Sequence, residues 1–220
     1  PYQLLIASSC PFDFFLAAKC APILFESANS VWLGSLASGL IHFSPSTGIF
    51  EHYMNTPSQP NLWPSNDVRT IAMDKQGDLW FGMHQGGVSK LLKDKKTFQH
   101  YLNDDDSYNL GSSYIWSIKL DSTGQLWLAS DGGGLLGYNA DSDSFFAYRH
   151  DVNNRNSIAS NKPTTVYEDS ANNLWVSLYP EGIDLINRSS ADVNQFYANS
   201  SSTHSVNDNG ILSIFEDSQQ

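Results

Sequence analysis

The chain has 220 residues, of which 40% are hydrophobic and 13% aromatic, and its formal net charge is −11. Ser, Asn, Asp, Gly and aromatic residues dominate over helix formers, which favours short strands joined by many turns. The acidic balance, with no basic stripe, argues against a nucleic-acid binder. No apolar run is long enough to span a membrane.

Residues 1–19 precede any regular pattern and form an unassigned N-terminal segment. Their apolar runs suit three origins that the sequence leaves open: the remains of a neighbouring repeat, a truncated signal segment or a frame error. The two cysteines, Cys10 and Cys20, fit no zinc spacing, and the histidines also lack metal spacing. The sequence therefore predicts no metal site and no cofactor.

From residue 20 onward, one pattern occurs four times and then begins again, which divides the chain into units 20–60, 61–108, 109–155, 156–203 and 204–220. Tryptophans at spacings of 48, 47 and 48 residues mark the first four units: Trp32, Trp80, Trp127 and Trp175. Six residues before each tryptophan stands an acid: Glu26, Asp74, Asp121 and Asp169. Seven residues after each stands a glycine: Gly39, Gly87, Gly134 and Gly182.

A repeat of this length, built from short strand patterns, is typical of a β-propeller with one blade per repeat. We therefore predict an all-β fold with about four four-stranded blades and the first strand of a fifth, as part of a larger propeller. In the second unit, apolar runs bounded by turn residues predict strands over residues 68–74, 78–82, 87–92 and 97–101.

Each repeated residue has a structural interpretation. Apolar neighbours on both sides of the tryptophan indicate a strand that is covered on both faces. The acid is expected to accept backbone N–H groups of the turn that follows it, and the glycine to open the third strand with a positive φ. Because these residues recur in every unit, we interpret them as parts of the scaffold, and not as sugar or phosphate sites.

The segments TIAMDKQGDLWFGMHQGGVSKLLKDKKTFQHY and SIKLDSTGQLWLASDGGGLLGYNADSDSFFAY spell out the repeat, and Asn109-Leu110 and similar boxes precede the first strand of a unit. In these features the chain resembles the two-component regulator propeller repeat family, over about residues 20–217. The resemblance implies the periplasmic sensor part of a membrane-anchored regulator, whose output is a hybrid histidine kinase or a diguanylate cyclase. It also implies an oligosaccharide as the sensed ligand.

In a propeller, the loops between second and third strands share one face with the linkers between blades. Residues that vary among blades at this face are expected to carry specificity. Tyr and Trp rings stack on sugar rings, and polar side chains bind hydroxyl groups. We therefore predict ligand contacts from Trp63, His84, Tyr114, Asp131, Tyr179 and Glu181.

Three functions stay open on the sequence alone, and a non-catalytic sensor is the favoured one. A polysaccharide-active propeller enzyme, either a glycoside hydrolase or a lyase, is the first alternative; a hydrolase needs two carboxylates across a cleft, for which Asp131 and Glu181 are the candidates. A protein–protein interaction scaffold is the second alternative. The sequence shows no catalytic constellation, predicts no nucleic-acid partner and no direct membrane contact, and leaves open whether the parent protein forms a homodimer.

Overall fold

The structure is a computed structural model that describes residues 22–58, 63–103, 106–201, 205–211 and 213–217. The unassigned segment 1–19 lies outside these residues. Within the described part of the chain, no helix is long and apolar enough to cross a lipid bilayer.

In the described residues, sixteen strands form four antiparallel sheets, each built from four strands that are consecutive in sequence. The first sheet contains β1 Ile23–Ser27, β2 Ser30–Gly34, β3 Leu40–Ser44 and β4 Ile49–Tyr53. The second contains β5 Val68–Met73, β6 Leu79–Met83, β7 Val88–Leu91 and β8 Phe98–Tyr101. The third contains β9 Ile115–Leu120, β10 Leu126–Ser130, β11 Gly134–Asn139 and β12 Ser144–Tyr148. The fourth contains β13 Pro163–Glu168, β14 Leu174–Leu178, β15 Gly182–Ile186 and β16 Val193–Phe196. A short 3-10 helix, η1 Asp106–Tyr108, lies in the linker between the second and third sheets.

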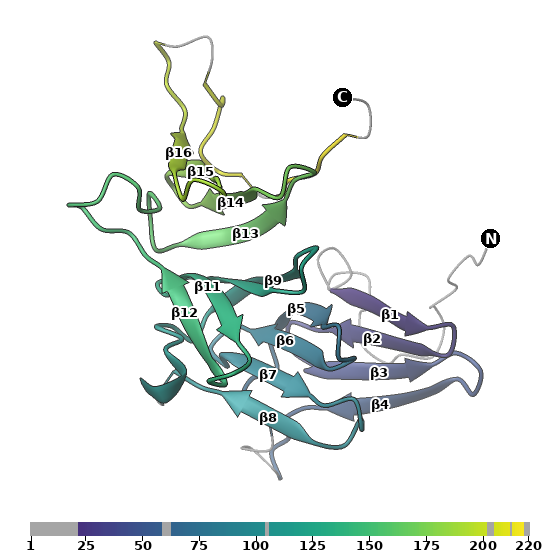
Figure 1. Ribbon diagram of the computed structural model, residues 1–220. Helices are drawn as coiled ribbons and strands as arrows, with labels where there is room; N and C mark the ends of the chain where they lie inside the picture. The colour runs from purple at the N-terminus through teal and green to yellow at the C-terminus, as the bar shows by residue number, and fades with distance from the viewer. Residues whose placement is uncertain (1–21, 59–62, 104–105, 202–204, 212, 218–220) are drawn as a thin grey trace.

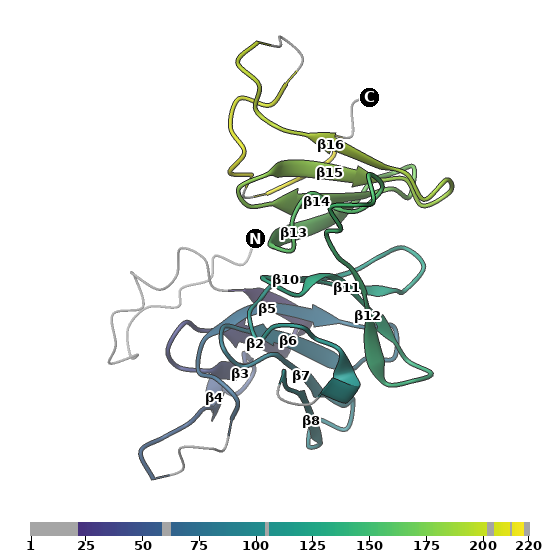
Figure 2. The same cartoon turned by 90° about the vertical axis from the view of Figure 1, so that its left-hand side faces the viewer.

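The sheets are arranged as consecutive blades of a partial β-propeller, which confirms the predicted fold class. They follow one another in chain order, and the inner strands β5, β9 and β13 lie beside one another (Figure 1). A view turned by 90° shows the fourth sheet as a layer stacked on the third (Figure 2). The strands of the second sheet agree with the predicted ranges to within one residue at each end.

The start of a fifth blade, expected at residues 204–220, stays a prediction. The described residues 205–211 and 213–217 contain no strand. The first strand of a blade pairs with the second strand of the same blade, as β5 does with β6. Among the described residues, no strand pairs with residues 205–211 or 213–217.

The hydrophobic cores lie between neighbouring blades. One core joins Trp32 and Leu40 of the first sheet to Phe81 and Leu91 of the second. Two further cores connect the second sheet to the third and the third to the fourth in the same way. Each blade therefore depends on its neighbours for burial, because a single four-stranded sheet has two faces to cover.

The repeated acid and tryptophan form a direct hydrogen bond in every blade. The indole Nε1 donates to the carboxylate at 2.8–2.9 Å in all four sheets. In the third blade, the other oxygen of Asp121 accepts the Gln125 N–H at 2.8 Å, which closes the turn between β9 and β10. Burial acts to raise the pKa of Asp121, but the hydrogen bonds that the carboxylate accepts, with Trp127 among the donors, outweigh it and hold the pKa below its ordinary value.

The repeated glycine is explained by its backbone and by its neighbour. Its φ is positive in all four blades, between 62° and 101°. A Cβ at this position would collide with the carbonyl oxygen of the aromatic residue that ends the outer strand, such as Tyr148 opposite Gly134. The glycine N–H also reaches the next linker, as in the 2.9 Å bond from Gly39 to the Asn66 carbonyl. These contacts confirm the structural interpretation of the repeat.

Candidate functional site

One end of the blades gathers the residues that vary most in character from blade to blade. Val68, at the start of β5, pairs with Met83, at the end of β6. The linker before β5 and the loop after β6 are therefore at the same end of the second sheet. Backbone hydrogen bonds repeat this arrangement in three blades, from His84 to Asp67 at 2.9 Å, from Asp131 to Tyr114 at 2.9 Å and from Tyr179 to Lys162 at 3.0 Å.

Three rings from the second and third blades meet at this end. The His84 ring centroid lies 4.7 Å from that of Tyr114 and 6.0 Å from that of Trp116. Gln85 Nε2 donates a hydrogen bond of 3.1 Å to the Tyr114 hydroxyl. All three rings are partly exposed, and Gln85 is exposed, so the surface that they form is open to solvent.

Charged groups surround the three rings. Arg69 donates to both carboxylate oxygens of Asp67, at 2.6 and 2.7 Å, and its guanidinium lies 5.0 Å from the Trp116 ring centroid. The His84 Nδ1 atom is 3.7 Å from Asp67 Oδ2. On the other side, Trp116 Nε1 donates to Asp131 Oδ2 at 3.4 Å.

We call this group of seven residues the rim cluster: Asp67, Arg69, His84, Gln85, Tyr114, Trp116 and Asp131. Within it, the positive charge of Arg69 is compensated by Asp67, while Asp131 accepts a hydrogen bond from the neutral Trp116 indole. A bidentate pair of this kind fixes the orientation of the guanidinium plane against the indole. The rim cluster thus combines ordered aromatic faces with amide and carboxylate acceptors, a mixture suited to a polar, uncharged ligand.

The structure brings together three of the predicted ligand residues, His84, Tyr114 and Asp131. Trp63 is not one of them, because only 4% of it is exposed. Its ring lies 5.0 Å from Phe98 and 6.3 Å from Phe81 between centroids, in the core between the first and second blades. The prediction of a ligand contact from Trp63 is therefore wrong, since this linker aromatic buries its apolar area against the neighbouring blade.

Tyr179 and Glu181 lie in the turn between β14 and β15 of the fourth blade. Tyr179 is 61% exposed and Glu181 is also exposed. Among the described residues, no side-chain hydrogen bond or ion pair connects either of them to the rim cluster. Their ligand contacts stay predictions, and so does any pairing of Asp131 with Glu181 across a cleft.

The sequence analysis missed Asp67, Arg69 and Trp116. These residues stand 13 or 11 positions before the tryptophan of their blade, at the start of the inner strand. The residue types at these two positions differ among the blades: Asp67, Tyr114 and Lys162 at the first, and Arg69, Trp116 and Thr164 at the second. This variation within an otherwise regular repeat was the available signal.

The described residues contain no group of three His, Cys, Asp or Glu side chains placed to hold a metal ion.

Comparison with known proteins identifies the repeat. The family model named two-component regulator propeller matches residues 62–85 and 109–132. The first range contains β5 and β6 of the second blade, and the second contains β9 and β10 of the third. No curated protein sequence matches the chain significantly.

Several solved structures share the fold at low sequence identity. The extracellular domain of a protein described as a hybrid two-component system of B. thetaiotaomicron has a TM-score of 0.65 at 20% identity, over 88% of this chain and 25% of that one. PorZ, a surface component of the type-IX secretion system of Porphyromonas gingivalis, has a TM-score of 0.60 at 20% identity, over 87% and 28%. Virginiamycin B lyase from Staphylococcus aureus has a TM-score of 0.57 at 17% identity, over 80% and 54%.

The chain therefore spans about a quarter of the first two of these structures and about half of the third. At these identities the similarity establishes the fold alone. Residues 62–85 and 109–132 match the two-component regulator propeller repeat, and they lie within a partial β-propeller.

Proposed function

We propose that this chain is a non-catalytic ligand-sensing propeller module, located in the extracytoplasmic part of a membrane-anchored bacterial signal-transduction regulator. The two-component regulator propeller repeats support this assignment. The fold it shares with the extracellular domain of a hybrid two-component system is consistent with it. Because the same fold also occurs in a lyase and in a secretion component, the repeats and the rim cluster carry more weight than the fold.

The observation that carries the proposal is the meeting of His84, Tyr114 and Trp116 from two blades at one solvent-open end. The ligand is a small, polar and uncharged molecule, with an oligosaccharide as the first candidate. Aromatic rings present apolar faces to sugar rings, while Gln85 and Asp131 offer hydrogen-bonding groups to hydroxyls. A ligand that contacts both blades favours the arrangement of the two blades that binds it best. Ligand binding can therefore change how the blades pack, and a sensor can transmit that change.

The test is a thermal-shift screen of neutral and acidic oligosaccharides on the purified protein. A ligand that binds the folded state raises the melting temperature by mass action. We expect a neutral oligosaccharide to do so, and His84→Ala and Tyr114→Ala to weaken its binding by about tenfold or more, since stacked aromatic groups are typical hot spots. His52→Ala, on the exposed outer strand β4, is the matched control and should bind as the parent does.

Two results would overturn the proposal. One is binding that is unaffected by both rim substitutions. The other is turnover of a bound oligosaccharide that Asp131→Ala or Glu181→Ala abolishes, because that result would assign the chain to the enzymes.

A further inference from the structure

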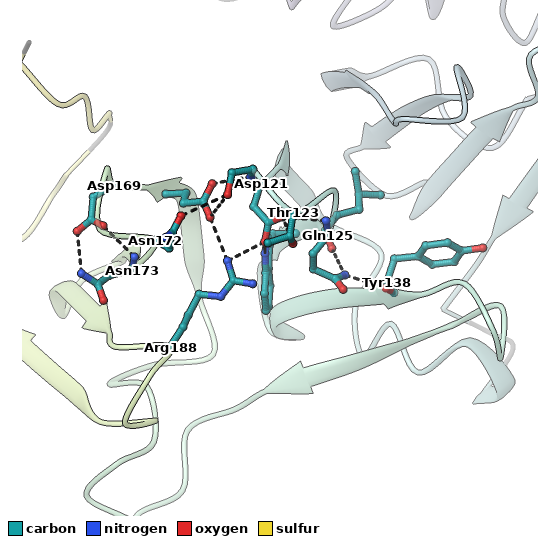
Figure 3. A network of polar contacts seen from close by, with 12 residues as sticks. Asp121, Thr123, Gln125, Tyr138, Asp169, Asn172, Asn173 and Arg188 are labelled. Atoms are coloured by element: carbon teal, nitrogen blue, oxygen red, sulfur yellow. Dashed lines mark hydrogen bonds and ion pairs between the residues drawn. The ribbon is translucent and has the colours of Figure 1, made fainter.

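A basic side chain connects neighbouring blades at the end opposite the rim cluster. Arg188, in the turn after β15, places Nη1 at 2.9 Å from Asp121 Oδ2 and at 3.0 Å from Glu168 Oε1 (Figure 3). Its guanidinium lies 5.9 Å from the Trp127 ring centroid. The repeated acid and tryptophan of the third blade are thus covered by a cation from the fourth.

A related contact occurs between the first and second blades. Lys95, in the turn after β7, lies 2.7 Å from Glu26, the repeated acid of the first blade. At both boundaries, the outer turn of the following blade supplies the positive charge that the repeated acid faces.

At the boundary between the second and third blades, the described outer turn of the third blade supplies no such cation, and Lys75 of the second blade instead donates from Nζ to the Ser122 carbonyl at 3.0 Å. Ala140 stands 13 residues after Trp127, the same repeat position that Arg188 holds after Trp175. Here an open groove of about 500 Å³ separates the blades, and Asp74, Trp80, Tyr138, Ala140, Asp141 and Phe146 are among the residues that line it. The groove therefore contains the counterparts of the acid and the tryptophan that Arg188 covers.

The charges around the groove favour a cationic guest. Lys90 lines it as well, but its Nζ atom lies 2.9 Å from Asp78, and 5.0 Å from the Trp80 ring centroid. Its charge is thus compensated within the second blade, while Asp74 of the second blade and Asp141 of the third both line the groove. Asp74, Asp78 and Asp141 together outnumber the two cations Lys90 and Lys75, so the net charge of these five side chains is negative.

Asp74 retains capacity for another donor. Its Oδ2 atom accepts the Trp80 indole N–H at 2.8 Å. The corresponding atom of Asp121 accepts the Trp127 indole N–H at 2.9 Å and also Arg188 at 2.9 Å. A carboxylate oxygen has two lone pairs, so the same double acceptance is open to Asp74.

We propose that this groove binds an arginine side chain of a polypeptide partner, in the place that Arg188 occupies at the next boundary. A guanidinium presents several donors in a fixed fork, so it can address carboxylates on two walls where an ammonium addresses one point. The volume of the groove leaves room for the peptide that carries the side chain. The site lies at the end of the sheets opposite the rim cluster, so the inference is independent of the proposed ligand.

The test uses three capped tripeptides, Gly-Arg-Gly, Gly-Lys-Gly and Gly-citrulline-Gly, with calorimetric titration of the purified protein. Citrulline has nearly the shape of arginine without its charge. We expect the arginine peptide to bind about tenfold or more tightly than the citrulline peptide, and its affinity to fall with added salt. Asp141→Asn should weaken the arginine peptide, because it removes the charge of one wall.

Ala140→Arg is the decisive variant, because it supplies the missing side chain from within the chain. We expect it to raise the melting temperature and to abolish binding of the arginine peptide. Ser46→Arg, in the exposed turn after β3, adds the same charge elsewhere and should change neither. Equal binding of the arginine and citrulline peptides, undiminished binding by Ala140→Arg, or free L-arginine binding as tightly as the peptide would each overturn the proposal.

Discussion

At the scale of single residues, the glycine that follows each tryptophan by seven positions shows how the repeat is enforced. Gly134 has φ of +87°, and a Cβ there would meet the Tyr148 carbonyl. Gly48 also has a positive φ, +70°, but a Cβ there would meet nothing within 4 Å. An alanine at Gly48 would therefore meet the cost of a positive φ alone, whereas an alanine at Gly134 would also collide with a carbonyl group.

We predict that Gly48→Ala costs about 1–2 kcal/mol of the free energy of unfolding, the usual penalty for a left-handed alanine. Gly134→Ala should cost about 1–3 kcal/mol more, because the carbonyl must move as well. Chemical denaturation of both variants measures the difference. Equal losses would show that the Tyr148 carbonyl does not constrain this position.

A buried acid in the fourth blade predicts an unusual dependence of stability on pH. Asp184 is 1% exposed; its Oδ2 atom accepts the Ala159 N–H at 2.8 Å, while Oδ1 has no hydrogen-bond partner among the described residues. Burial raises the pKa of this carboxyl to about 6, against opposing effects of the Ala159 N–H and His150. Because the folded-state pKa lies above the unfolded one, the neutral carboxyl favours folding at low pH, and this contribution is lost as the pH rises through about 6.

Asp184→Asn should therefore stabilise the protein by about 1–3 kcal/mol near pH 8 and have little effect near pH 4. Thermal melting of both proteins across this pH range provides the measurement. A variant that is destabilised at pH 8 would indicate that the charged form has a partner that the fold requires.

At the scale of elements, the blades are held together by side chains that cross their boundaries. Arg188 neutralises Asp121, whose side chain is 1% exposed, and it also contacts Glu168 of its own blade. Removal of one partner of a buried ion pair is costly because the other charge stays buried.

We predict that Arg188→Met destabilises the protein by about 1–3 kcal/mol, a loss limited by the indole and backbone donors that Asp121 keeps. Arg155→Met, at an exposed position of the linker before the fourth blade, is the matched control and should be neutral. Urea denaturation compares the two variants. A neutral Arg188→Met would mean that the cation contributes nothing to the boundary, and it would remove the precedent for the groove at Ala140.

At the scale of the whole molecule, the segment after the fourth blade repeats the way in which one blade meets the next. Ser122 donates from its N–H and its hydroxyl to Glu168, at 2.6 and 3.0 Å. Ser170 donates in the same manner to Glu216, at 2.8 and 2.6 Å. Glu216 thus makes with Ser170 of the fourth blade the contacts that Glu168, at the end of the inner strand β13, makes with Ser122 of the third.

We predict that Glu216→Gln speeds amide hydrogen exchange at Ser170 and leaves Ser122 unchanged, because the charged acceptor is the stronger partner. Glu168→Gln is the matched variant and should have the opposite selectivity. Exchange at Ser170 that does not respond to Glu216→Gln would show that the segment is not docked in solution.

The repeat made the fold predictable, whereas the rim cluster depends on packing that a repeat does not encode. The tryptophan, acid and glycine occur in phase, and the acid bonds the tryptophan of its own blade in all four blades. Trp63 and Trp116 are both tryptophans outside this phase, but the first packs into a core and the second lies in the rim cluster. Their surroundings in the folded chain distinguish them, because the Trp63 ring packs against Phe81 and Phe98, while the Trp116 ring contacts Arg69 and Asp131.

The most direct measurement is a crystal structure of the protein with a neutral oligosaccharide that the thermal-shift screen selects. The account predicts ligand density against His84, Tyr114 and Trp116, with the four repeated tryptophans still bonded to their acids. Density at the repeated tryptophans, or at a surface remote from the rim cluster, would contradict it.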